Sequence, residues 1–206
     1  MLGFWLGWRL GRHHRDSADS HRSAEPPGID WKAFGEAYWE DVATFRGPVP
    51  AESAIPAELR SLDRWVRYSS RKAALTVTGG AASSTNPATW STYAEAVASK
   101  TGAGLGFVLN GDGLCCIDLD HCLVDGKPNG AARRFLAKLP RTYIEVSPSG
   151  EGLHVWGRAA VPTGRRVVVD GLSVDVYGVG RYMTVTGKPY AVRPLADLSA
   201  VVANIA

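Results

Sequence analysis

The sequence contains few cysteines and none of the spacings typical of zinc sites. Its three cysteines, Cys115, Cys116 and Cys122, lie close together without a C-x-x-C pair, which excludes the usual zinc frameworks. We expect them to be buried and reduced, as in a cytoplasmic protein. The P-loop pattern G-x-x-x-x-G-K-[ST] is also absent. Any helicase activity would therefore come from a separate chain or from a further C-terminal part.

Long apolar runs and a strong net charge are absent as well. The apolar stretch of residues 1–10 is shorter than the roughly 20 residues that a membrane span needs. Its positive charges follow the apolar run, whereas a secretory signal places them before it. We therefore expect no membrane partner. A net charge of +3 permits a nucleic-acid partner without requiring one.

The length of the chain and its helix-ending and turn-forming residues predict one main domain with an N-terminal extension. A chain of 206 residues that is 45% hydrophobic can bury one core. We expect a flexible tail over residues 1–28, then a helix and a proline-rich linker over residues 29–54. Asp30 is a good N-cap for that helix, and Gly47-Pro48 supplies its stop. The main domain is expected over residues 55–206.

Two acidic residues stand one residue apart at the end of an apolar run. Residues 104–109 and the run that contains Asp118 and Asp120 are separated by Gly111-Asp112-Gly113, which predicts a β-hairpin. Side chains two apart on a strand share a face, about 6.5 to 7 Å from each other. The two carboxylates then repel each other unless a cation lies between them. The pair by itself fits a solvated strand end as well as a cation site.

A histidine follows a turn rich in glycine and serine. Residues 142–146 and 153–157 read as two strands joined by the turn 147–152. Alternation places His154 and Trp156 on one face, which we expect to be the polar face. The glycines of the turn let backbone N–H groups approach an anion, and histidine is a suitable phosphate partner. A structural role for His154 is the alternative.

A third acid and an arginine lie on later strands. On the strand 173–177, Asp175 points away from its valine neighbours, where an unpaired charge is expensive. A metal ion or an arginine would offset that cost. On the strand 180–187, Arg181 can hold a phosphate with its planar guanidinium group, or it is an ordinary surface residue.

Helical spacing of apolar residues completes the expected elements. We expect helices over residues 88–99, 131–139 and 195–205, and a helical turn that leads into a strand at 65–68. Three acids and a histidine distributed over separate strands are what two-metal nucleotidyl transfer requires. In that chemistry, carboxylates bridge two Mg²⁺ or Mn²⁺ ions about 3.5 to 4 Å apart.

Five stretches, taken in order, also give the chain a family likeness. From Ile55 to Thr186 it resembles the bifunctional primase-polymerase domain of the archaeo-eukaryotic primase superfamily, as found in phage and plasmid replication proteins. Each stretch is weakly specific, but their order and spacing together are quite specific. The stretches are residues 82–90, 104–108, 117–122, 147–154 and 180–187.

The resemblance implies an α+β fold with an RRM-like antiparallel catalytic sheet beside a smaller α/β unit. It also implies that Asp118, Asp120 and Asp175 bind two divalent ions, Mg²⁺ or Mn²⁺, and that His154 contacts the incoming triphosphate. Further nucleotide-binding positions fall on Ser149, Arg181 and Lys72. Lys72 departs from the family pattern, because Ala73-Ala74 follows it.

The expected activity is that of a DNA primase and polymerase in phage or plasmid-type replication, acting in the cytoplasm of a bacterial host. Its partners would be a single-stranded DNA template, a primer, and dNTPs or NTPs. One alternative is a non-catalytic module that binds single-stranded DNA through Trp90, Trp156, Tyr177 and Arg165-Arg166. Another is a metal-dependent nuclease that uses the same acids.

Overall fold

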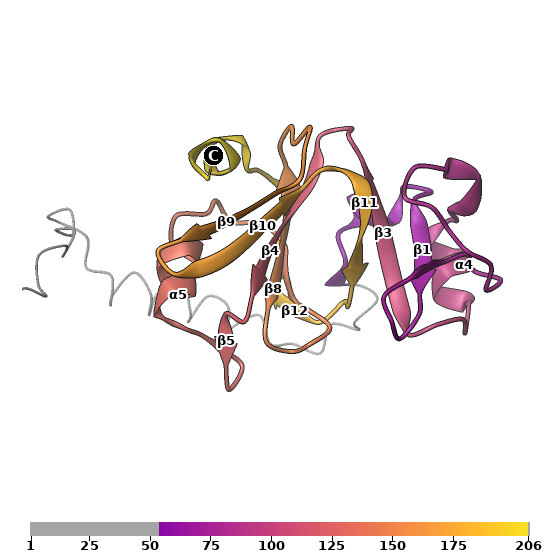
Figure 1. The fold of residues 1–206 in the computed structure, drawn as a ribbon, viewed down its shortest axis with the longest axis horizontal. Coiled ribbons are helices and arrows are strands. Elements are labelled where there is room, and N and C mark those ends of the chain that lie inside the picture. Colours follow the sequence, from indigo (N-terminus) through magenta and orange to yellow (C-terminus); the bar gives the residue numbers. More distant parts are fainter. Residues whose placement is uncertain (1–53, 206) are drawn as a thin grey trace, which may run out of the picture. The chain divides into compact units, whose positions relative to one another are not determined.

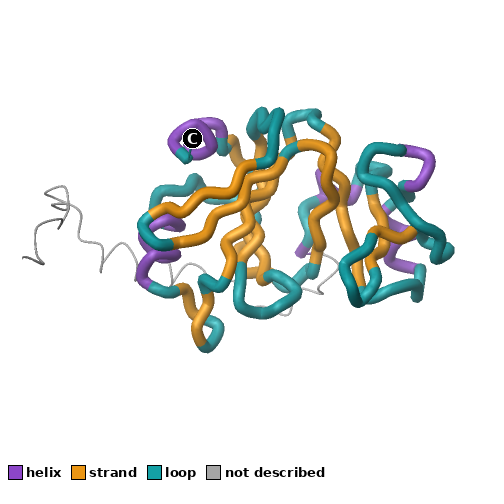
Figure 2. The backbone as a smooth tube through the Cα atoms, viewed as in Figure 1, coloured by secondary structure: helices purple, strands orange, loops and turns teal. Residues whose placement is uncertain are grey.

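The computed structural model describes residues 54–205. The predicted tail over residues 1–28 and the predicted helix and linker over residues 29–54 therefore lie outside the described residues, except for residue 54. Strands dominate the described part, and its helices are few and short, as Figure 2 shows. The predicted α+β class is confirmed. No helix between residues 54 and 205 is long and apolar enough to cross a membrane.

The described elements are short. The helices are α3 (Ala57–Arg60), the 3₁₀ helix η1 (Pro87–Thr89), α4 (Tyr93–Ala98), α5 (Gly130–Leu136) and α6 (Ser199–Asn204). The strands are β1 (Trp65–Tyr68), β2 (Ala74–Leu75), β3 (Gly104–Asn110), β4 (Leu114–Asp120), β5 (Leu123–Val124), β6 (Lys127–Pro128), β7 (Ile144–Val146), β8 (Leu153–Arg158), β9 (Arg165–Val169), β10 (Leu172–Tyr177), β11 (Val179–Val185), β12 (Pro189–Ala191) and β13 (Ala196–Asp197).

Two larger sheets organise these strands, and β5 and β6 pair separately (Figure 1). The first sheet is antiparallel, with four strands in the order β11-β3-β1-β2. The second has seven strands, in the order β12-β7-β8-β4-β10-β9, with β13 paired in parallel to β8. All other pairs in the second sheet are antiparallel.

The predicted hairpin of β3 with β4 is wrong, although both strands are present. β3 pairs with β1 and β11, so both of its edges are occupied. β4 pairs with β8 and β10 in the other sheet. Gly111 and Gly113 both adopt positive φ, and the segment between them carries the chain from one sheet to the other. Arg64 holds this segment, because it donates to Asn110 and to Asp112.

Two hydrophobic cores lie on the two faces of the seven-stranded sheet. One core contains Ile117, Val155 and Val174 of the sheet with Phe135 of α5 and Val202 of α6. The other core is shared by the two sheets. Its members include Trp65, Phe107, Cys116 and Trp156, and the rings of Phe107 and Trp156 meet edge to face with centroids 6.0 Å apart. Apolar contacts thus cover one face of the sheet and, on the other face, the part around Cys116 and Trp156.

The helix predictions were partly correct. The helix expected at 131–139 is α5, which buries Phe135 and Leu136 as predicted. The helix expected at 88–99 is shorter, because Thr92 and Glu95 form a capping box that starts α4 at Tyr93. The helix expected at 195–205 is shorter: α6 begins at Ser199, because Ala196–Asp197 pairs with β8 as strand β13. The strand at 65–68 and the helical turn before it are both present.

Candidate functional site

A row of five charged or titratable side chains crosses the seven-stranded sheet. Directly opposed residues in antiparallel strands share a face. Glu145 on β7 is opposite His154 on β8, which is opposite Asp118 on β4. Asp118 is in turn opposite Asp175 on β10, which is opposite Arg166 on β9. The register therefore brings together three of the residues singled out from the sequence, His154, Asp118 and Asp175.

Asp118 lies at the centre of this row and is partly buried, with 21% of its side chain exposed. Burial raises the pKa of this carboxyl, His154 and Lys72 lower it, and the neighbouring acids Asp120 and Asp175 raise it further. Nε2 of His154 lies 3.7 Å from Oδ1 of Asp118. Negative charge thus accumulates at Asp118 and is only partly compensated.

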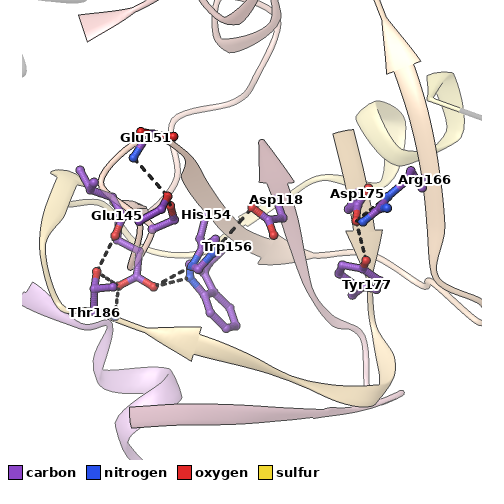
Figure 3. Close-up of polar contacts among 12 residues, drawn as sticks. Asp118, Glu145, Glu151, His154, Trp156, Arg166, Asp175, Tyr177 and Thr186 are labelled. Atoms are coloured by element: carbon purple, nitrogen blue, oxygen red, sulfur yellow. Dashed lines mark hydrogen bonds and ion pairs between the residues drawn. The ribbon is translucent and has the colours of Figure 1, made fainter. Parts of the chain in front are cut away.

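Asp175 is held by an arginine, one of the two alternatives that its sequence context left open. Nε of Arg166 donates to its two carboxylate oxygens at 2.8 and 3.1 Å, and a terminal nitrogen donates at 2.7 Å. The hydroxyl of Tyr177 donates to Asp175 at 2.6 Å. These contacts, Arg166 first, hold the pKa of Asp175 below its usual range although only 3% of the side chain is exposed. Figure 3 shows this cluster beside Asp118.

The acids have the donor chemistry of a divalent-metal site, although that site is not assembled. Among residues 54–205, no group of three or more His, Cys, Asp and Glu side chains is arranged to hold a metal ion. Carboxylate oxygens are nevertheless the donors that Mg²⁺ and Mn²⁺ prefer. Burial first, and then repulsion by Asp120 and Asp175, raises the pKa of Asp118, and a bound cation would offset that repulsion. Arg166 donates to both oxygens of Asp175 and therefore competes with a metal ion for this carboxylate.

His154 is buried, contrary to the prediction that it lies on a polar face. It shares its face with Asp118, and only 3% of its side chain is exposed. The reason is that Trp156 and Cys116, on the same face, pack against the four-stranded sheet. Nδ1 of His154 lies 3.4 Å from Oε1 of Glu145, an acid that our reading of the sequence missed. A charged residue within the apolar strand 142–146 was the available signal.

A pocket of about 350 Å³ opens beside the row. This volume lies within the range of small-ligand sites, roughly 300 to 1,000 Å³. All the predicted nucleotide-binding residues line it, together with two of the three predicted metal-binding acids; Asp175 does not. The lining residues include Lys72, Ser84, Asp118, Asp120, Ser147, Ser149, His154, Arg181 and Tyr182.

Lys72 reaches the pocket from the loop between β1 and β2. Its backbone has a φ of 59°, a conformation unusual for a residue with a side chain. The hydroxyl of Tyr182 on β11 donates to the carbonyl of Lys72 and so ties the loop to the four-stranded sheet. The two residues after Lys72 depart from the family pattern, and the tertiary contact nevertheless brings Lys72 to the pocket.

The turn that contains Ser149 is partly closed on itself. The N–H of Gly150 donates to the carbonyl of Ser147, and the N–H of Glu151 donates to the hydroxyl of Ser149. These two N–H groups therefore already have acceptors within the turn. Fewer N–H groups of the turn remain to bind an anion than the sequence led us to expect. Gly152 is required for a different reason. A Cβ at this position would lie 2.7 Å from the carbonyl oxygen of Leu119, so only glycine lets the turn approach β4.

The aromatic residues expected to stack on DNA bases are not presented for that role. Trp156 is fully buried. The indole N–H of Trp90 donates to the carbonyl of Ser83 at 2.7 Å. The guanidinium carbon of Arg181 lies 4.1 Å from the ring centroid of Tyr177. Trp156 is therefore unavailable for stacking, while Trp90 and Tyr177 are half-buried and each already has one contact within the chain.

Comparison with known proteins shows a similarity to a phage replication enzyme. The chain is 42% identical over 121 residues to a DNA primase-polymerase from Nitratiruptor phage NrS-1. The match takes in 54% of this chain, and the chain spans 17% of the length of the phage protein. No protein-family model matches the chain. The similarity confirms the likeness to a phage primase-polymerase domain that the sequence motifs predicted.

Proposed function

We propose that this chain carries the catalytic domain of a DNA primase-polymerase, which performs template-directed nucleotidyl transfer in phage-type replication. One observation carries the proposal: Asp118, Asp175 and His154 lie in register across one sheet, beside a pocket lined by Lys72 and Arg181. The similarity to the phage enzyme supports it. We propose residues 55–206 as the domain, with the seven-stranded sheet as the primase-type catalytic sheet.

The proposed reaction joins a nucleotide to a growing strand. The 3′-hydroxyl of a primer, or of the first nucleotide in priming, attacks the α-phosphorus of a dNTP or NTP. A bond from that oxygen to the α-phosphorus forms, the bond to the bridging oxygen of the β-phosphate breaks, and pyrophosphate leaves. The hydroxyl proton passes to solvent. A single-stranded DNA template selects the incoming base by pairing.

The pocket residues would act on the phosphates by charge and by hydrogen bonding. The ammonium group of Lys72 and the guanidinium group of Arg181 would neutralise phosphate oxygens, and the hydroxyl of Ser149 would donate to them. His154 would present Nε2, the nitrogen nearest Asp118. Together these groups would hold the triphosphate against the acidic row, which orients the α-phosphorus for in-line attack.

Asp118, Asp120 and Asp175 are the residues that would hold the divalent ions, Mg²⁺ or Mn²⁺. Such ions, when bound, lower the pKa of an attacking hydroxyl and neutralise the charge on the triphosphate and leaving group. The three carboxylates come from the adjacent strands β4 and β10, which fixes their spacing. Arg166 would release Asp175 when the acids are used in this way.

Primer extension and de novo priming test the proposal. We expect the wild-type chain to lengthen a primer with dNTPs in the presence of Mg²⁺ or Mn²⁺. The activity of the double variant Asp118→Ala/Asp120→Ala should fall by more than about 100-fold. This exceeds the usual loss when a residue that only supports a metal ligand is replaced. Asp63→Ala, which changes an exposed acid outside the pocket, is the matched control.

Three results would contradict the proposal, and two of them would identify another function. Undiminished synthesis by the double variant would exclude the acids as the catalytic site. Shortening of the labelled strand in place of lengthening would identify a nuclease. Metal-independent DNA binding without any dNTP-dependent product would identify a binding module.

A further inference from the structure

Glu145 is a fully buried acid, with none of its surface exposed. A buried carboxylate is expensive unless hydrogen-bond donors surround it. Glu145 has six donors, which come from three separate parts of the chain. Oε2 accepts from the hydroxyl of Tyr143 at 3.1 Å, the N–H and hydroxyl of Thr186 at 3.0 and 3.2 Å, and the N–H of Gly187 at 3.0 Å. Oε1 accepts from the ring nitrogens of His154 and Trp156 at 3.4 and 3.3 Å.

The two oxygens of Glu145 have different partners. Oε2 joins β7 to the segment that follows β11, which is a structural contact. Oε1 faces β8, because Glu145 and His154 are directly opposed in register. Figure 3 shows the carboxylate of Glu145 between Thr186 on one side and the two rings on the other. One oxygen therefore ties two strands together, and the other is directed at a ring that lines the pocket.

The contact fixes which nitrogen of His154 faces the pocket. A carboxylate only accepts hydrogen bonds, so Nδ1 of His154 carries the proton in this contact. With Nδ1 held by Glu145, the ring presents its other nitrogen, Nε2, toward Asp118. The partner of one imidazole nitrogen generally sets the orientation and role of the other.

We propose that Glu145 is a positioning residue, which holds the imidazole of His154 so that Nε2 is the nitrogen offered to a nucleotide phosphate. The part of this inference that concerns a nucleotide rests on the proposed function. Glu145 itself touches neither the pocket nor any reacting atom, and it acts through His154.

Glu145→Gln tests the contact at nearly unchanged volume, because the side chain would then turn a donor toward His154 and Trp156. Nδ1 of His154 can become an acceptor, whereas the indole N–H of Trp156 cannot and loses its partner. The four donors around Oε2 would keep the amide oxygen on their side, which places the amide NH₂ group against His154. Nδ1 would then lose its proton and accept from the amide, and the proton would move to Nε2. Tyr143→Phe is the matched control, because it also removes one hydrogen bond from Glu145 but leaves His154 untouched.

Nitrogen NMR of the His154 ring gives a readout that needs no activity. In the wild type, and in Tyr143→Phe, we expect the chemical shift of a protonated Nδ1. In Glu145→Gln we expect the shift of an unprotonated Nδ1. The same Nδ1 shift in Glu145→Gln as in the wild type, or an equal change in Tyr143→Phe, would overturn the proposal. If Glu145→Gln does not fold, the wild-type shift still decides, because an unprotonated Nδ1 contradicts the contact.

A double-mutant cycle in primer extension tests the functional part. We expect Glu145→Gln to raise the KM for the incoming nucleotide between about 10-fold and 100-fold, with a smaller change in kcat. In a His154→Ala background it should raise KM no further, because Glu145 acts only through that ring. A further increase of similar size would contradict the proposal. A wild-type chain that makes no DNA would refute the proposed function, whereas the nitrogen shifts would still decide the role of Glu145.

Discussion

Gly106 on β3 lies beneath the ring of Tyr182, and an alanine there would displace that ring. A Cβ at this position would be 2.6 Å from Cδ2 and 3.1 Å from Cε2 of Tyr182, and 3.0 Å from Cγ2 of Val66. Gly106 lies between β1 and β11, opposite Val66 and Thr184, so the backbone has little room to move away. The substitution Gly106→Ala therefore forces the tyrosine ring to shift.

The expected cost follows from this overlap. Overfilling a packed site typically costs about 1 to 3 kcal/mol. For a chain of this size, that lowers the melting temperature by roughly 2 to 12 °C. The ring of Tyr182 also stacks on Tyr68, and its hydroxyl donates to the carbonyl of Lys72. When the ring moves, the loop that carries Lys72 loses this anchor, and the KM for the nucleotide should rise.

Thermal denaturation and nucleotide-dependent primer extension measure the two effects. Gly130→Ala is the control, because it makes the same change at the first residue of α5. The nearest atom to a Cβ there is 3.5 Å away, at the end of the flexible Arg134 side chain. Alanine in a helix is also favoured over glycine by about 0.5 to 1 kcal/mol. If Gly106→Ala kept the wild-type melting temperature and KM, the role given to this contact would be refuted.

Three further predictions concern the acidic row and the core. Arg166→Gln should lower the Mg²⁺ concentration at half-maximal primer extension, since Arg166 competes for the oxygens of Asp175; an unchanged midpoint would contradict this competition. Asp118→Asn should abolish synthesis. It should keep or raise the melting temperature measured without metal at pH 7, because the raised pKa of Asp118 means that its ionised form is disfavoured in the folded chain. A clear fall in this melting temperature would contradict the prediction. Burial raises the pKa of Cys115 and Cys122 to about 12 and that of Cys116 well above its usual range. All three thiols should therefore resist a thiol reagent at pH 8 until denaturant is added. Fast labelling of the folded chain would show instead that they are accessible.

The sequence predicted most strands but not how they pair. Alternation and turn residues indicated the strands that became β4, β8 and β10, because these signals are local. The partner of a strand depends on which edges remain open, and the neighbouring runs of β3 and β4 suggested a hairpin that does not form. β3 is already flanked by β1 and β11 in the four-stranded sheet. Whether the edge of a strand is already paired depends on the tertiary structure, and a local sequence pattern does not predict it.

The sequence predicted which residues form the candidate site better than it predicted what surrounds them. Asp118, His154 and Asp175 were identified singly, and the register that aligns them arises only when β4, β8 and β10 pair. The burial of His154 was missed, because the four-stranded sheet that covers its face is distant in sequence. Arg166 was considered only as a contact to DNA. Glu145 could have been identified from the sequence, because a charge within an apolar strand needs a partner. This reasoning pointed to Asp175 and holds equally for Glu145.

The position of Mn²⁺ in crystals grown with a non-hydrolysable dNTP tests the central claim most directly. The anomalous scattering of manganese locates the ion without reference to the protein density. We predict peaks within coordination distance of Asp118, Asp120 and Asp175, about 2.0 to 2.3 Å from their oxygens, with Arg166 withdrawn from Asp175 and Nε2 of His154 facing the triphosphate. Peaks away from these carboxylates, or an Arg166 that still holds both oxygens of Asp175, would contradict the assignment of this row as the site of nucleotidyl transfer.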